Sequence, residues 1–109
     1  MTDLASKKCV PCEGGTPPLP LGQVDVLIKS VKGWTALGNQ QIDQNFKFKN
    51  FTQAMEFIND VAQVAEVENH HPDIFLHNWN QVIITLSTHA IGGLSENDFI
   101  LAAKIDQLL

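Results

Sequence analysis

The sequence predicts an α+β fold in which a four-stranded antiparallel sheet carries three helices on one face. Apolar residues recur at helical spacing in three segments, and apolar and polar residues alternate in the segments between them. The predicted order is helix, strand, strand, helix, strand, strand, helix. Because short turns join the strands of each pair, we expect antiparallel strands with helices covering one face of the sheet.

The first half of the chain is expected to form one helix and two strands. Apolar residues follow the helical period over residues 21–31, and Gly33 is a stop signal. Residues 34–37 indicate a short strand, and residues 38–39 indicate a turn. Over residues 44–50, two phenylalanines alternate with lysines, which is typical of a half-buried strand.

A long second helix is expected to follow. Its apolar stripe covers four turns and comprises Phe51, Met55, Ile58, Val61 or Ala62, and Ala65. Asn50 or Thr52 can cap its start. Pro72 forbids continuation much beyond His70 and His71. The helix is therefore expected to end on two adjacent histidines.

The remaining elements are a second hairpin and a third helix. Strands are predicted over residues 74–79 and 81–89, joined tightly around residues 78–80. Ser95 and Asp98 have the spacing of a capping box, in which both side chains satisfy free amides at a helix start. The expected buried stripe of this last helix is Leu101, Ile105 and Leu108.

Length and composition are those of one globular domain. The chain has 109 residues, of which 44% are hydrophobic, and this is enough for one core. Residues 1–20 are expected to be an N-terminal arm rich in glycine and proline, and residues 21–109 the folded domain. No apolar run approaches the ~20 residues of a membrane span. The N-terminal segment lacks the apolar stretch of a signal peptide, so a cytoplasmic location is expected.

The charge balance argues against nucleic acid and polyphosphates as partners. Seven lysines and twelve acidic residues give a net charge of −5, and the chain contains no arginine. Nucleic-acid binders neutralise phosphates with basic patches, and arginine is the residue that binds phosphate and guanine bidentately. A neutral or weakly charged small molecule is the expected partner.

Cys9 and Cys12 form a single Cys-x-x-Cys pair in the arm. A structural zinc site usually takes four ligands, and the chain has no second pair. A redox pair normally opens a helix after a strand, whereas Pro11 separates these cysteines and glycines follow them. A turn with two reduced thiols is the favoured interpretation, and metal, disulfide and redox roles stay open.

Three histidines are candidates for chemistry. Alternation along residues 82–89 puts four side chains on the core face and His89 on the opposite, uncovered face. Because the hairpin folds back along the sheet, His70 and His71 are expected to approach His89. Glu66 lies one helical turn before His70, where a carboxylate orients the imidazole and favours its protonated form.

Spacing alone leaves three interpretations of these histidines open. The first is acid–base catalysis near neutral pH. The second is a zinc site, although adjacent histidines rarely reach one metal ion together. The third is no chemistry, since a histidine suits the C-terminal end of a helix dipole and His89 can be a solvated strand end. His77 in the hairpin has only such a structural interpretation.

A longer pattern contains these residues. The run Glu66-x-x-x-His70-His71-Pro72, followed at fixed spacings by Trp79, His89 and Asp98, closely resembles the signature of the pterin-4a-carbinolamine dehydratases. Residues 84–89 and 93–95 are similar to that family too. Residues 9–15 resemble an arm of many of its microbial and plant-type members. The similarity extends from about Cys9 to the C-terminus.

The resemblance implies the same fold and a specific activity. Family members remove water from 4a-hydroxytetrahydropterin to give quinonoid dihydropterin, with no cofactor and no metal. One imidazole would protonate the departing hydroxyl group and another would accept the N5 proton. The implied catalytic residues are His70, His71 and His89. The implied pterin-binding residues are Asn69, His70, His71, Ser87, Thr88 and His89, supported by Glu66 and Asp98.

Three expectations concern partners. The resemblance implies a homodimer or tetramer and a functional link to an aromatic amino-acid hydroxylase, whose cofactor the reaction recycles. Independently, the stripe of the last helix continues to Leu109 with no later element to bury it, which indicates an exposed apolar interface. The alternative to an enzyme is a non-catalytic interaction module, because some animal members act as dimerisation cofactors of a homeodomain transcription factor.

Overall fold

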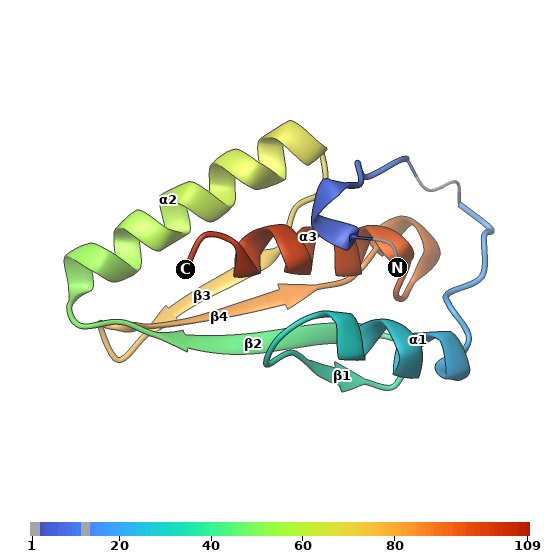
Figure 1. The fold of residues 1–109 in the computed structure, drawn as a ribbon, viewed down its shortest axis with the longest axis horizontal. Coiled ribbons are helices and arrows are strands. Elements are labelled where there is room, and N and C mark those ends of the chain that lie inside the picture. Colours follow the sequence, from blue (N-terminus) through green and yellow to red (C-terminus); the bar gives the residue numbers. More distant parts are fainter. Residues whose placement is uncertain (1–2, 12–13) are drawn as a thin grey trace.

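A computed structural model describes residues 3–11 and 14–109. It has one antiparallel sheet of four strands and three α-helices, which confirms the predicted α+β fold (Figure 1). The strands are β1 (Thr35–Leu37), β2 (Gln41–Lys47), β3 (Asp73–His77) and β4 (Gln81–Leu86), in the order β1-β2-β4-β3. The helices are α1 (Leu21–Leu27), α2 (Phe51–Glu68) and α3 (Glu96–Asp106), with 3-10 turns at Leu4–Ser6, Ile28–Ser30 and His89–Ile91.

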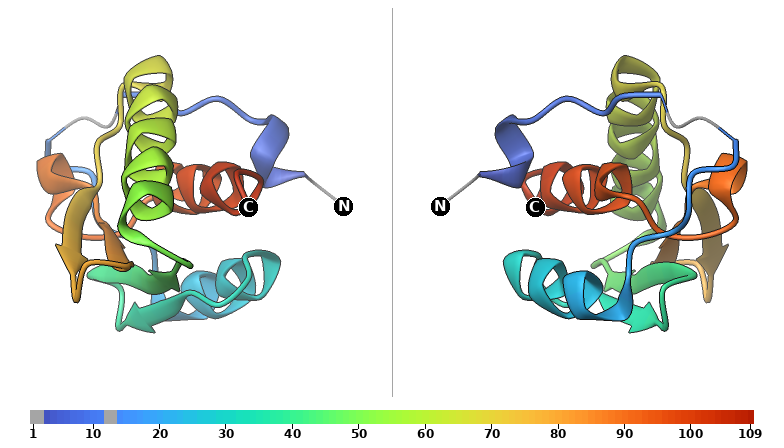
Figure 2. Two further views of the ribbon diagram at one scale, coloured as in Figure 1. Left: turned by 90° about the vertical axis from the view of Figure 1, so that its left-hand side faces the viewer. Right: turned by 90° about the vertical axis from the view of Figure 1, so that its right-hand side faces the viewer.

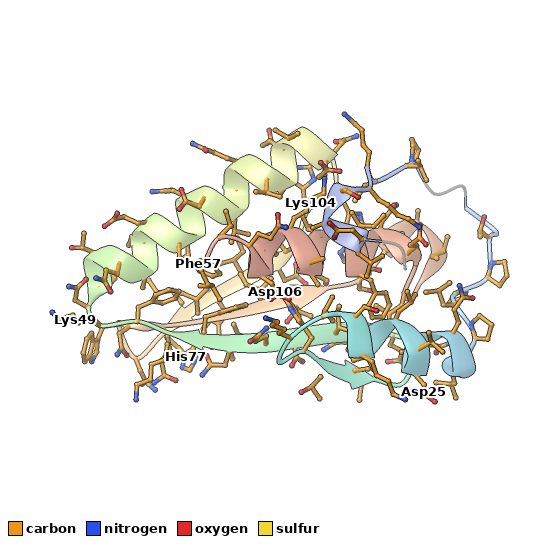
Figure 3. All side chains as sticks on the ribbon, in the orientation of Figure 1. Asp25, Lys49, Phe57, His77, Lys104 and Asp106 are labelled. Atoms are coloured by element: carbon orange, nitrogen blue, oxygen red, sulfur yellow. The ribbon has the colours of Figure 1, made fainter. Side chains whose placement is uncertain are left out.

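The core lies between one face of the sheet and the helices. Figure 2 shows α2 and α3 together over the sheet and α1 beside them along β1. Val82, Ile84 and Leu86 of β4 are fully buried, whereas the side chains between them are only partly covered. In Figure 3, Phe57 lies between α2 and the sheet, and His77 lies on the other side. The alternation predicted for this strand is confirmed.

The ends of β2 and β3 differ from the prediction. β2 runs over Gln41–Lys47 instead of 44–50, because the chain leaves the strand before Asn50 caps α2. β3 ends at His77 because Asn78 and Trp79 have positive φ angles of 49° and 58°, which suit a tight hairpin turn and not a strand. The predicted strands are present, but their ends are set by these local turns.

α2 begins as predicted and buries a partly different row of residues. The Asn50 side chain accepts the N–H of Gln53 at 2.8 Å and caps the helix. The buried face is Ala54, Phe57, Val61, Ala65 and Glu68. Val61 and Ala65 of the predicted stripe are buried, whereas Phe51 is 50% exposed and the stripe was wrong there. Two neighbouring rows of this helix are apolar, and only contact with the sheet and α3 decides which row is buried.

α3 is enclosed within the molecule. The capping box of Ser95 and Asp98 is confirmed. Leu101 and Ile105 are fully buried in the chain's own core. The prediction that this stripe forms an exposed interface was therefore wrong for Leu101 and Ile105, whereas Leu109 at its end is 70% exposed. The sheet, α2 and the N-terminal turn at Leu4–Ser6 surround the helix and cover the stripe.

The N-terminal segment packs closely on the domain where it is described. Leu4 and Cys9 belong to the buried core. Beyond its 3-10 turn at Leu4–Ser6, the described part of the arm has no regular element, as predicted. Cys9 is a free thiol, and the predictions about Cys12 lie outside the described residues. Within the described part of the chain, no helix is long and apolar enough to cross a membrane.

Candidate active site

The C-terminus of α2 directs two histidines away from the helix. Asn69 caps the helix in the left-handed conformation, with φ 53° and ψ 41°. The N–H of His70 then donates to the carbonyl of Ala65 at 3.2 Å, a bond typical of a Schellman cap. His70 and His71 therefore follow the helix instead of ending it, contrary to the prediction, because Asn69 has already reversed the chain.

A turn after β4 carries the third histidine. Thr88 and Gly93 pair through two backbone hydrogen bonds, of 2.9 and 3.4 Å, and enclose the 3-10 turn His89–Ile91. The strand ends at Leu86, so the predicted alternation does not extend to His89. The exposed His89 lies beyond the C-terminal end of β4 and not, as predicted, in a strand on the uncovered sheet face.

Gly93 has a steric role in this turn. A Cβ atom at this position would lie 2.8 Å from the carbonyl oxygen of Asn39 and 2.8 Å from Pro18. Any side chain would therefore push the turn away from the segments beneath it. Glycine at 93 lets the turn carrying His89 pack closely.

Asp98 is the centre of a buried hydrogen-bond network. Its Oδ1 lies 2.6 Å from Nε2 of His70, and its Oδ2 accepts from the Thr88 hydroxyl at 2.8 Å and from the Ser95 N–H at 3.0 Å. The carboxylate is fully buried, which is tolerated because both oxygens accept hydrogen bonds. The network joins the start of α3 to the turn after β4 and fixes the imidazole of His70.

The predicted pairing of Glu66 with His70 is wrong. Glu66 instead bonds to Nε2 of His71, and His70 points inward to Asp98. The helical four-residue spacing no longer applies at His70, because Asn69 leaves the helix in a left-handed conformation. The Glu66 and His71 side chains are 75% and 57% exposed, so their pairing contributes little stability.

All three histidines line one cavity of about 230 Å³. The predicted residues in its wall are Asn69, His70, His71, Ser87, Thr88 and His89. Val10, Pro11, Ala90 and Asn97 line it as well and were not predicted. The similarity of residues 9–15 to a family arm was a signal that could have pointed to Val10 and Pro11. Asp98 does not line the cavity but contacts His70 through its Oδ1.

The network determines which nitrogen of His70 is available. A buried carboxylate that only accepts hydrogen bonds places the proton of the neutral ring on Nε2. Nδ1 is then the nitrogen that can take up or release a proton. In the described residues, no group of three or more His, Cys, Asp or Glu side chains has an arrangement that could hold a metal ion. Proton transfer is the chemistry that this arrangement offers directly.

His77 lies apart from the cavity. Its ring stacks on Phe75 with centroids 5.3 Å apart, and its Nε2 lies 2.9 Å from Oδ1 of Asn45. Figure 3 shows His77 on the face of the sheet that the helices leave uncovered. The structural interpretation expected for this histidine agrees with its position.

Known proteins resemble this chain over most of its length. Residues 17–108 match the family described as pterin 4 alpha carbinolamine dehydratase. A protein of Rubrobacter xylanophilus is 44% identical over 108 residues, covering 99% of this chain and 100% of its own. A protein of Nitrosospira multiformis is 51% identical over 106 residues, covering 97% and 92%. Both carry the provisional name pterin-4-alpha-carbinolamine dehydratase.

Two solved structures are also similar. A transcriptional coactivator/pterin dehydratase from Brucella melitensis has a TM-score of 0.77 and 33% identity, covering 84% of this chain and 97% of its own. A pterin dehydratase-like protein identified as a RuBisCO assembly factor in the alpha-carboxysome has a TM-score of 0.59 and 26% identity, covering 70% and 88%. Proteins with this fold are thus described in both dehydration and assembly roles.

Proposed function

The chain belongs to the pterin 4 alpha carbinolamine dehydratase family, and from this premise we propose that it dehydrates 4a-hydroxytetrahydropterin by histidine acid–base catalysis. The names of its relatives identify the reaction class as that of a hydro-lyase acting on a pterin carbinolamine. The observation that carries the proposed mechanism is the cavity shared by three histidines, one of which is held by buried Asp98 at 2.6 Å.

The proposed elimination is redox-neutral. The C4a–O bond and the N5–H bond break, and a C4a=N5 double bond forms. One imidazolium donates a proton to the departing hydroxyl group, which leaves as water, while a neutral imidazole accepts the N5 proton. His70 suits the role of base, since its Nε2–H bond to Asp98 leaves Nδ1 with a lone pair. His71 and His89 are the candidates for the acid.

Alanine variants test this mechanism. General acid–base groups contribute about 10²–10⁴-fold in rate, so His70→Ala and His89→Ala should each lose that much activity and stay folded. His77→Ala is the matched control, because its ring contacts Phe75 and Asn45 and not the cavity. The measurement is the dehydration rate of chemically generated carbinolamine, with circular dichroism to monitor folding. Full activity in the His70 and His89 variants would refute histidine catalysis.

The same assay tests the expectation that no metal takes part. Treatment with a chelator should leave the rate unchanged, because imidazoles alone can carry out both proton transfers. Loss of activity that zinc restores would make the histidines metal ligands and would refute the acid–base mechanism.

We also propose a biological setting. The reaction would recycle a tetrahydropterin in the cytoplasm for an aromatic amino-acid hydroxylase, the class of enzyme that produces 4a-hydroxypterins. The family assignment supports this setting. Adding the chain to a coupled hydroxylase reaction should raise the steady-state yield of quinonoid dihydropterin. An unchanged yield would count against the link.

Homo-oligomerisation is a further part of the proposal. The edge strand β3 presents Phe75 at 60% exposure, and Trp79 in the adjoining turn is 61% exposed. An edge strand with exposed apolar side chains favours pairing with another copy. This surface takes the place of the α3 stripe, which is buried within the chain.

A non-catalytic interaction role is the second candidate. It is favoured by one observation, the similarity to a pterin dehydratase-like protein described as an assembly factor. Such a role requires no acceleration of dehydration. A wild-type rate equal to the uncatalysed rate would therefore support it and would refute the enzymatic proposal.

A further inference from the structure

The N-terminal arm reaches the cavity and is held there by buried side chains. Asn97, which is 5% exposed, pairs with both backbone groups of Val10: its Oδ1 accepts the N–H at 3.0 Å, and its Nδ2 donates to the carbonyl. Glu68 accepts the N–H of Cys9 at 2.9 Å and in turn accepts from Lys104 at 2.8 Å. Two consecutive arm residues are thus tied to α2 and α3.

The clamp fixes a backbone whose side chains stay exposed. Val10 is 64% exposed and, with Pro11, lines the cavity, while Cys9 before it is buried in the core. The buried side-chain amide of Asn97 hydrogen-bonds both the N–H and the carbonyl of Val10. It stabilises one position of the arm, because release of the arm would remove these hydrogen bonds from a buried amide group. The apolar side chain of Val10 is therefore held at a fixed position in the wall of the cavity.

The arm differs chemically from the rest of the cavity. The other lining residues contribute imidazole, hydroxyl and amide groups from the segment after α2, from the turn after β4 and from Asn97 of α3. Val10 and Pro11 contribute only hydrocarbon, and Pro11 has no N–H. The cavity therefore combines polar groups that suit the hydrogen-bonding edge of a heterocycle with a hydrocarbon surface on the arm that suits carbon atoms.

We propose that Val10 and Pro11 form a substrate-binding wall that contacts the apolar part of the pterin, and that Asn97 is the residue that positions this wall. The inference rests on the proposed function of the same cavity. In this proposal the arm contributes to the affinity for the substrate, and the histidines carry out the proton transfers.

Val10→Ala tests the wall. Removing two methyl groups from a contact that is partly buried by the ligand should raise KM about 3- to 10-fold, with kcat within about twofold. Val26→Ala and Val67→Ala are matched controls, because these valines are 65% and 68% exposed and lie outside the cavity. Their KM should stay at the wild-type value. An unchanged KM in Val10→Ala, or an equal rise in the controls, would overturn the wall.

Asn97→Ala tests the positioning role. If Asn97 acts through Val10, then Asn97→Ala raises KM, and the double variant with Val10→Ala raises it no further than the larger single effect. Fully additive effects would mean that Asn97 itself contacts the pterin, and they would overturn the positioning role.

Alkylation of Cys9 reports the position of the arm without any assay of activity. Burial, together with the nearby charge of Glu68, raises the pKa of the Cys9 thiol to about 12, so iodoacetamide should label it slowly at pH 8. In a Cys12→Ser background, Asn97→Ala should speed labelling at least tenfold, whereas Val10→Ala should not. Equal labelling rates with and without Asn97 would overturn the clamp.

Equilibrium binding separates failure of this inference from failure of the proposed function. Fluorescence titration with 7,8-dihydrobiopterin should give weaker binding in Val10→Ala than in Val67→Ala, even if the wild type does not accelerate dehydration. If the wild type is active and the two variants bind the ligand equally well, the proposed substrate-binding wall is refuted and the proposed function is not.

Discussion

Asp98 performs three roles through two oxygen atoms. It orients His70, binds the hydroxyl of Thr88 and caps α3 through the N–H of Ser95. A neutral amide at this position would turn an NH₂ group toward at least one of these donors. Loss of such a buried network affects both the orientation of the imidazole and the start of the helix.

We therefore expect Asp98→Asn to lower kcat about 10- to 100-fold, the usual cost of losing a supporting carboxylate behind a functional histidine. It should also lower the free energy of unfolding by about 1–3 kcal/mol, because a buried donor loses its acceptor. Rates and urea unfolding curves measure the two effects. Glu66→Gln is the control, because Glu66 pairs with exposed His71 and should change stability little. Wild-type kcat in Asp98→Asn would contradict the assigned role.

The residue-level errors have a common physical origin. Glu66 was paired with the wrong histidine because helical spacing was extended through His70, whereas Asn69 has a left-handed conformation. Local sequence permits that conformation without requiring it. The role of Asp98 at the site was predicted only through the family signature, because its contact with His70 joins segments 28 residues apart.

The end of α2 depends on the conformation of Asn69, which also lines the cavity. Asn69→Gly should keep the stability within about 1 kcal/mol, since glycine adopts positive φ readily. Asn69→Val should cost about 1–3 kcal/mol, because a β-branched residue is strained at φ 53°. Thermal or urea unfolding measures the difference. If both variants are equally stable, the cap does not hold the histidines as described.

The folded Asn69→Gly variant also reports on the side-chain amide. A rise in its KM with unchanged stability would support the predicted contact between Asn69 and the pterin. An unchanged KM would mean that Asn69 ends the helix but does not contribute to binding of the pterin.

The clamp between the arm, α2 and α3 should weaken in acid. Burial by itself would raise the pKa of Glu68, but the hydrogen bond and charge of Lys104 and the N–H of Cys9 outweigh it and hold the pKa below its usual value of 4.5. Glu68 thus stabilises the folded chain above about pH 4.5, and the contribution is lost as the pH falls through the lower pKa of the folded state.

Glu68→Gln should therefore be less stable than the wild type at pH 7, with a difference that narrows as the pH falls below 4.5. Urea unfolding at pH 7, 5 and 3.5 measures the difference, and Glu56→Gln on the exposed side of α2 is the control. A difference that stays constant with pH would exclude this clamp as its source.

Periodicity predicted the types of the elements better than their ends. The alternation of β4 and the capping box of α3 were correct because both patterns are local. The end of β3 depends on positive φ angles at Asn78 and Trp79, and the end of β4 on a bridge between Thr88 and Gly93. Neither the angles nor the bridge follows from the alternation of apolar residues.

At the scale of the whole molecule, the proposed oligomer should depend on β3. Phe75→Lys puts a charge on the exposed edge strand, and lysine on such an edge opposes pairing. Light scattering should then report 12.0 kDa for the variant and a multiple of that mass for the wild type. Val26→Lys on α1, which replaces a valine of similar exposure (65% against 60% for Phe75), should keep the wild-type mass. A monomeric wild type would refute the oligomer.

The approach of His70 and His71 to His89 could be predicted from the hairpin topology, whereas the chemistry of the site could be predicted only with the help of the family resemblance. Spacing alone left catalysis, metal binding and no chemistry open for the histidines. The shared cavity of His70, His71 and His89 depends on how α2 and β4 end against each other. The predicted exposure of Leu101 and Ile105 was wrong for a similar reason, because the apolar periodicity of a helix does not indicate how many neighbouring elements surround it.

The unequal burial of the site residues has an evolutionary consequence. Asp98 is fully buried and belongs to the folding of α3, whereas His71 and His89 are exposed. Under the proposed mechanism, mutations of these histidines would abolish the reaction and hardly affect folding, while changes at Asp98 would be removed by selection for stability. Gene copies released from selection for dehydration can therefore drift at the histidines, keep an intact scaffold and acquire new binding partners.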